Sequence, residues 1–308
     1  MQIYLPIADL PVNIFLVLGM GLAVGFISGM FGIGGGFLMT PLLIFIGVSP
    51  AVAVASVTSH IAASSFSGAI SYWRRNAVDV ALALMLLAAG IVGTAAGVWL
   101  FTLLRALDQL DLVIGLSYVT LLTVVGALMI YEALQATWRA LHGGPAIIRR
   151  PGSHTWMHGL PFKLRFKRSK IYVSAIPVWA IGFIIGFIGA IMGVGGGFLL
   201  VPMLIYFLRV PTATVIGTSM MLTLVTMATA TVMHAATNHL VDAVLALILM
   251  VGGVIGAQFG ARTGQNMRGE RLRLLLGLLV LAVGLRFLYE LVVTPDDLYS
   301  IRYLAGAG

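Results

Sequence analysis

Hydrophobic residues gather in long segments that short polar or charged connections separate. Five such segments precede a long polar stretch and five follow it: residues 12–31, 36–48, 51–73, 78–104 and 110–137, then 172–192, 197–208, 212–236, 241–261 and 271–293. Most approach or exceed the roughly 20 residues that a helix needs to cross a bilayer. The pattern predicts an all-α polytopic membrane protein, a single transmembrane domain over residues 1–308.

A glycine-rich break precedes the short second segment of each half. The first copy reads GIGGGFLMTP from Gly32, and the second reads GVGGGFLLVP from Gly193. Each segment after a break is too short to span a bilayer comfortably, which predicts a half-helix of a re-entrant hairpin. Paired glycine interruptions in two halves of a membrane protein point to the binding site of a transporter.

The two halves also match beyond the glycines. Thr58-Ser59 in the third segment corresponds to Thr218-Ser219, and Asp79, at the start of the fourth segment, corresponds to Asp242. A shared need for helix packing explains isolated glycines but not an ordered series. We therefore predict two repeats, residues 12–137 and 172–293, joined by a basic cytoplasmic loop at 138–171.

The basic residues predict that the two repeats have opposite orientations. Arg74 and Arg75 follow the third segment of the first repeat, whereas the corresponding connection of the second repeat, residues 238–240, has no lysine or arginine. After the fourth segment the second repeat instead carries Arg262, Arg268, Arg271 and Arg273. Because lysine and arginine favour the cytoplasmic side, inversion with both termini outside fits best. Inversion would let the two glycine breaks meet near the midplane.

Composition excludes several classes of protein. The chain is 60% hydrophobic and 9% charged, which a soluble domain of 308 residues could not accommodate. It has no cysteine, so thiol chemistry is excluded. The net charge of +8 reflects membrane topology and lipid contact rather than nucleic-acid binding. The glycine motif lacks the Lys-Ser/Thr and βαβ context of a nucleotide loop, and no cofactor or metal is expected.

The glycine breaks are the candidate binding site for a small anion. Glycine lets backbone N–H groups face a cavity, and a helix N-terminus carries about half a positive charge. The alternative is that the glycines only permit tight packing or a hinge. The candidate substrate-binding residues are Gly34, Gly35, Gly36, Thr58, Ser59, His60, Gly195, Gly196, Gly197, Thr218 and Ser219.

Each candidate side chain also has a structural alternative. The hydroxyls of the Thr-Ser pairs could bond their own helix backbone instead of an oxyanion. His60 could contact substrate, relay protons or be a satisfied core residue, whereas His234 is expected near the interface. Asp79 and Asp242 are interpreted first as helix caps, with proton coupling as the alternative. The other serines of that segment, Ser56, Ser64, Ser65 and Ser67, are interpreted as packing residues.

The chain resembles the TauE/SafE family of sulfite exporters over about residues 12–137 and 172–293. The resemblance lies in the paired Gly-x-Gly-Gly-Gly-Phe, in the Thr-Ser that follows each copy, and in the Val-Asp at 78–79 and 241–242. The resemblance implies export of sulfite, sulfoacetate or related organosulfonates across the bacterial inner membrane by a secondary transporter using alternating access. An anion channel, or an importer of another small anion, stays open, as does a homodimer. An enzyme is not expected, since adjacent residues such as Ser59 and His60 diverge on a helix.

Overall fold

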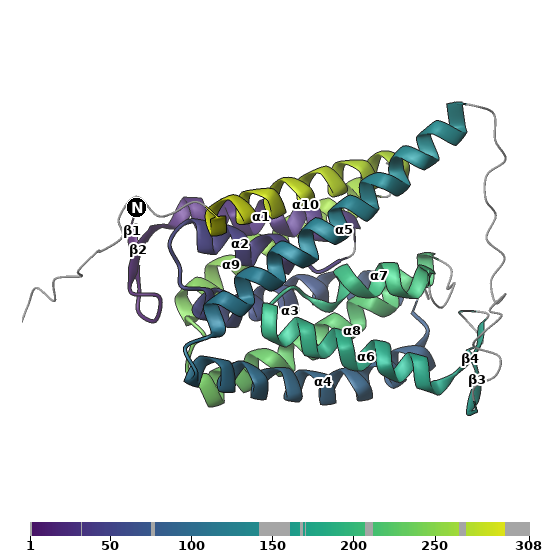
Figure 1. Ribbon diagram of the computed structural model, residues 1–308, viewed down its shortest axis with the longest axis horizontal. Coiled ribbons are helices and arrows are strands. Elements are labelled where there is room, and N and C mark those ends of the chain that lie inside the picture. Colours follow the sequence, from purple (N-terminus) through teal and green to yellow (C-terminus); the bar gives the residue numbers. More distant parts are fainter. Residues whose placement is uncertain are drawn as a thin grey trace, which may run out of the picture.

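The computed structural model describes residues 2–31, 33–74, 78–141, 161–166, 169, 171–206, 212–264 and 269–292. In these ranges the chain forms helices and two small hairpins (Figure 1). The helices are α1 (Ile14–Phe31), α2 (Gly36–Phe45), α3 (Pro50–Arg74), α4 (Val80–Ala106), α5 (Leu110–Leu141), α6 (Ala175–Met192), α7 (Gly196–Tyr206), α8 (Thr212–Met233), the π-helical turn η2 (His234–Asn238), α9 (Ala243–Gly264) and α10 (Gly269–Val292).

The predicted segments and the fold class are confirmed. Each hydrophobic segment becomes one helix, whose ends lie within a few residues of the predicted boundaries. Six helices of the described chain are long and apolar enough to cross a membrane: α1, α4, α5, α6, α8 with η2, and α9. Helices α2 and α7 contain 10 and 11 residues, which at about 1.5 Å per residue cannot span a bilayer core of about 30 Å.

Two antiparallel hairpins, not predicted from the sequence, precede α1 and α6. The first joins β1 (Gln2–Leu5) to β2 (Leu10–Asn13), and the second joins β3 (Lys163–Phe166) to β4 (Ile171–Ser174). They lie at opposite ends of the helical bundle (Figure 1). Most of the basic loop, including residues 142–160, lies outside the described residues, as does its predicted lipid contact.

Close glycine contacts fix the directions of two helix pairs. A Cβ placed on Gly25 of α1 would lie 2.4 Å from the carbonyl oxygen of Gly253 in α9, and one on Gly29 would lie 2.1 Å from that of Ala257. Because both contacts advance in the same sense, α1 and α9 run parallel. Helices α4 and α6 repeat this arrangement, with Gly93 against Phe183 and Gly97 against Phe187.

The central helices α3 and α8 run antiparallel. The Thr231 hydroxyl donates to that of Thr58 over 2.8 Å, while a Cβ on Gly68 would lie 2.2 Å from the Met220 sulfur. Helix α9 runs parallel to α3, because Asp242 lies against Ser56 and Leu249 against His60.

By the same criterion α4 runs parallel to α8, since Asp79 lies against Thr218, while Gly90, further along α4, lies against Leu222 and Thr226, further along α8. Helices α1, α3 and α9 therefore run one way and α4, α6 and α8 the other. Corresponding helices of the two halves are thus opposed. This is the relation that an inverted repeat requires, whereas the orientation of the halves in a bilayer stays a prediction.

Candidate functional site

The two glycine breaks contact each other through their backbones. A Cβ placed on Gly34 would lie 3.9 Å from the Cα of Gly195. One on Gly36 would lie 2.3 Å from the carbonyl oxygen of Gly193, and one on Gly197 would lie 2.8 Å from that of Ile33. Only residues without a side chain can approach this closely. An anion held between the breaks therefore requires that they separate.

Each break reverses the chain so that a short helix begins in the protein interior. Gly35 is the N-cap of α2 with φ 70°, in the left-handed region that favours glycine, and it supplies no side-chain cap. A Cβ there would lie 3.0 Å from side-chain atoms of both Ser28 and Val24 on α1. In the second half Gly193 (φ 63°) ends α6, and Gly195 (φ 77°) precedes α7. The partial positive charges of two helix N-termini thus come together.

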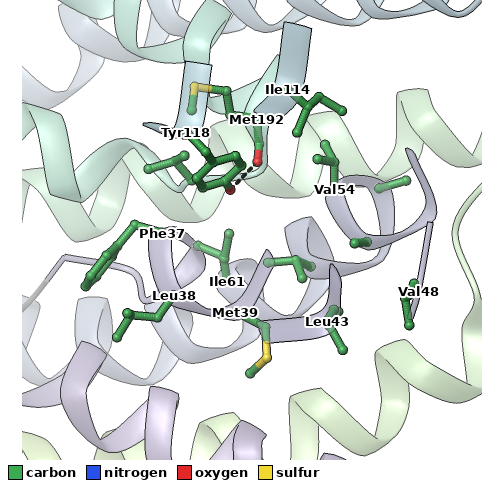
Figure 2. Close-up of a cluster of buried hydrophobic side chains, with 14 of the residues drawn as sticks. Phe37, Leu38, Met39, Leu43, Val48, Val54, Ile61, Ile114, Tyr118 and Met192 are labelled. Carbon is green, nitrogen blue, oxygen red and sulfur yellow. Dashed lines mark hydrogen bonds between the residues drawn. The ribbon is translucent and has the colours of Figure 1, made fainter. Parts of the chain in front are cut away.

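Side chains of the first half hold the second break in place. The buried Tyr118 hydroxyl of α5 donates to the carbonyl oxygen of Met192 over 2.5 Å, as Figure 2 shows. The Thr40 hydroxyl of α2 donates to the carbonyl oxygen of Gly193 over 3.4 Å. After the breaks, the rings of Phe37 and Phe198 stack at a centroid distance of 4.5 Å. The contact between the halves is therefore both polar and aromatic.

The predicted hydroxyl ligands mostly bond backbone carbonyl groups. The hydroxyls of Thr58, Ser59 and Ser219 each donate to a carbonyl three residues earlier, over 2.6, 2.6 and 2.9 Å. The Thr218 hydroxyl accepts from the backbone N–H of Asp79 over 3.3 Å. The structure thus shows the backbone-bonding alternative for three of the four residues, and their contact with substrate stays a prediction.

His60 faces α9 rather than the glycine breaks. Its Nδ1 lies 2.8 Å from the carbonyl oxygen of Leu249, so Nδ1 carries the proton and donates it. A Cβ on Gly253 would lie 2.2 Å from the His60 ring. The other nitrogen, Nε2, is buried without a hydrogen-bond partner among the described residues. The side chain that α3 brings to the breaks is the neighbouring Ile61, 3.2 Å from a Cβ on Gly34.

Asp79 caps its helix as predicted and also binds the hairpin that precedes α6. One carboxylate oxygen accepts from the backbone N–H of Leu82 over 3.3 Å at the start of α4. The other accepts from both the backbone N–H and the hydroxyl of Ser169, over 2.8 and 2.7 Å. The first half thus anchors the hairpin of the second half.

Asp242 has the corresponding role at the other end of the bundle. It accepts from the N–H groups of Val244 and Leu245 in α9, each over 3.1 Å, and from that of Ile7 in the first hairpin over 2.9 Å. Its own backbone N–H donates to the Ser56 hydroxyl over 3.0 Å. The hydroxyls of Ser56 and Thr218 therefore accept from the backbone N–H groups of the two aspartates in the same way. The proposed coupling role of the aspartates stays a prediction.

His234 is buried inside the protein, close to the end of the segment that α8 and η2 form, and its location near the membrane interface stays a prediction. The π-helical turn η2 continues α8 past Met233 and turns the imidazole inward. Its Nε2 lies 3.1 Å from the carbonyl oxygen of Ala190, and its ring lies edge-on to Phe101 at 4.6 Å. The apolar pattern alone gives no sign of this π-turn.

Thr223 was not among the predicted site residues, although it lies beside both glycine breaks. Its methyl carbon lies 3.2 Å from a Cβ placed on Gly34, and its hydroxyl oxygen 3.5 Å from one placed on Gly196. In sequence it is one of several threonines in α8, and only its contacts distinguish it from the others.

The family described as "Sulfite exporter TauE/SafE" matches residues 17–287, which include both glycine breaks. The chain belongs to this family. It is thus a member of a family of membrane transporters. The helices of its described residues are those of a multi-pass membrane protein.

Its relatives carry names of the same kind. A "Probable membrane transporter protein" of Xylella fastidiosa is 29% identical, covering 90% of this chain and 96% of its own length. The "Probable membrane transporter protein YunE" of Bacillus subtilis is 24% identical, with 88% and 96% covered. "Sulfite exporter TauE/SafE family protein 1" of Arabidopsis thaliana is 45% identical over 17% of this chain and 12% of its own. No solved structure matches.

Proposed function

We propose that this protein is a secondary transporter that exports small sulfur-containing anions, such as sulfite, sulfoacetate or related organosulfonates, across the bacterial inner membrane. The observation that carries the proposal is the backbone contact between the two glycine breaks, Gly34 against Gly195. Two short helices begin at this contact, and their N-termini provide positive potential without a buried cation. A name shared with sulfite exporters supports the substrate class.

Alternating access supplies the mechanism of the proposal. The breaks belong to different halves, and the corresponding helices of those halves run in opposite directions, which favours an exchange between two related conformations. In the structure the breaks touch, so binding of an anion between or beside them accompanies their separation. With the cell interior negative, one exported negative charge releases about 2.3 kcal/mol per 100 mV. Export of an anion therefore needs no coupled ion.

The arrangement of the candidate nucleophile and base favours transport over catalysis. Ser59 donates to the carbonyl oxygen of Ser56, while the adjacent His60 donates to Leu249 on α9. The two side chains serve different helix contacts and do not form the hydrogen-bonded pair that nucleophilic catalysis requires.

The proposal is tested by the midpoint of thermal unfolding of the purified protein in detergent, measured with each anion of a panel. The panel comprises sulfite, sulfate, sulfoacetate, phosphate and chloride. We expect sulfite or a sulfonate to raise the midpoint of unfolding, because a ligand that binds only the folded state stabilises it. Gly35→Val, which places a side chain at φ 70° against α1, should remove that shift. Gly19→Val is the matched control, since a Cβ on Gly19 has nothing within 4 Å.

A shift for chloride alone would favour a halide channel with this fold. Absence of any shift in the wild type, or an undiminished sulfonate shift in Gly35→Val, would contradict the proposed site.

A further inference from the structure

Thr223 differs from most buried hydroxyl residues of the central helices. Nearby hydroxyls on α8, including those of Thr226 and Thr229, donate to carbonyl groups four residues earlier, over 2.8 and 2.9 Å. Thr223 is 1% exposed, yet its hydroxyl has no hydrogen-bond partner among the described residues. A buried polar group without a partner is costly, so such a group usually has a functional explanation.

The position of this hydroxyl connects it to the glycine breaks. Its oxygen lies 3.5 Å from a Cβ placed on Gly196, the first residue of α7. It therefore faces the N-terminal turn of that helix, where backbone N–H groups have no partner four residues back in the helix and the helix dipole is positive. The same side chain contacts the position of Gly34 on the other break, through its methyl carbon at 3.2 Å.

A second hydroxyl without a partner lies at the same level on α3. The antiparallel register pairs Thr58 with Thr231 and Gly68 with Met220, which places Ser65 of α3 at the level of Thr223 of α8. Ser65 is also 1% exposed and has no hydrogen-bond partner in the described chain. Two such hydroxyls near the middle of two adjacent helices are the donors that an oxyanion can use.

We propose that the Thr223 hydroxyl, assisted by Ser65, binds a sulfite or sulfonate oxygen at the N-terminus of α7. This inference rests on the proposed function and names the side chain that recognises the substrate. Neutral donors together with a helix N-terminus bind an oxyanion without a permanent counter-charge. Binding is then weak enough for release, as transport requires. Ile61 of α3 also lies beside both breaks, 3.2 Å from a Cβ on Gly34 and 3.0 Å from one on Gly195, and it is apolar, so the two halves contribute unequally.

The experiment compares Thr223→Val, Thr223→Ser and the control Thr226→Val in proteoliposomes, with radiolabelled sulfite and sulfoacetate as probes. Valine has the shape of threonine without its hydroxyl, and serine keeps the hydroxyl. We expect Thr223→Val to raise KM at least about tenfold, the equivalent of one charge-assisted hydrogen bond. Thr223→Ser and Thr226→Val should stay within about twofold of the wild type, since the Thr226 hydroxyl only bonds its own helix.

Thermal unfolding without anion separates a binding role from a structural one. Removing an unpartnered hydroxyl from an apolar site should leave the unfolding midpoint of Thr223→Val unchanged or raised. An unchanged KM in Thr223→Val overturns the inference. It is also overturned if Thr223→Val lowers the unfolding midpoint and Thr226→Val loses transport to a similar degree.

If the wild type transports neither probe, the proposed substrate class fails. The Thr223 site is then tested by the thermal shift with phosphate and chloride. A shift that Thr223→Val abolishes and Thr226→Val keeps would support an anion site, and its absence would overturn the inference.

Discussion

Gly36→Ala tests whether the two glycine breaks touch in the folded protein. The added Cβ would lie 2.3 Å from the carbonyl oxygen of Gly193 and 2.3 Å from the Cδ1 of Ile61. Carbon atoms in favourable contact lie about 3.5–4.0 Å apart, so both neighbours must move by more than about 1 Å. The Ile61 methyl group can rotate away, but the carbonyl oxygen belongs to the backbone of the other break.

We expect Gly36→Ala to lower the free energy of unfolding by about 1–3 kcal/mol, the usual cost of overpacking a well-packed interior. The control is Gly19→Ala on α1, where a Cβ has nothing within 4 Å. Because alanine restricts the unfolded chain more than glycine does, the control should be neutral or stabilising by about 0.5–1 kcal/mol. Fluorescence-monitored unfolding of both variants in one detergent provides the comparison.

The double variant Gly36→Ala with Ile61→Val locates the contact. Valine lacks the Cδ1 atom, so one of the two short contacts disappears while the contact with Gly193 stays. The loss of stability in the double variant should therefore be smaller than the sum of the single losses. If Gly36→Ala is as stable as Gly19→Ala, the breaks do not touch as described. If the losses simply add, Gly36 does not lie against the Cδ1 of Ile61.

Three further predictions concern the hairpins and the contact between the halves. Asp242→Ala should speed hydrogen exchange at the Ile7 amide and cost about 0.5–2 kcal/mol as a lost helix cap, while Asp242→Asn, which keeps one acceptor oxygen for the cap, should cost less. Unchanged exchange at the Ile7 amide in Asp242→Ala would contradict this contact. Tyr118→Phe removes the donor to Met192 and should lower the free energy of unfolding by about 1 kcal/mol in thermal melts, whereas an unchanged melt would argue against that bond. The hydrogen bond with Asp9 raises the pKa of Tyr4 above its ordinary value of 10.0, so this bond is present below pH 10 and is lost as pH rises through the raised pKa. The difference between the absorbance titrations of the wild type and Tyr4→Phe should show the Tyr4 phenol titrating above pH 10. Titration of this phenol at or below pH 10 would refute the contact.

The helices and the meeting of the breaks could be predicted because both leave strong signals. Long apolar segments delimit α1 to α10, and the repeated glycines of 32–36 and 193–197 mark the two interruptions. The crossings of α1 with α9 and of α4 with α6 also involve glycines, including Gly93 in α4 and Gly256 in α9.

Features that depend on contacts between distant residues could not be predicted. Strands of four residues have too short an alternation to be detected, so the two hairpins became visible only through their pairing and their bonds to Asp79 and Asp242. The π-turn that buries His234 leaves no periodic signal. Thr223 resembles its neighbours in sequence and is distinguished by an unpartnered hydroxyl beside Gly196.

Efflux from proteoliposomes tests the central claim that the touching breaks form an anion transport site. Vesicles loaded with radiolabelled sulfoacetate, held at an inside-negative potential, would contain the wild type, Gly35→Val or Gly19→Val. The account predicts saturable efflux that the potential accelerates, present in the wild type and Gly19→Val and lost in Gly35→Val. Equal efflux from all three proteins, or none from the wild type with any sulfur oxyanion, would contradict it.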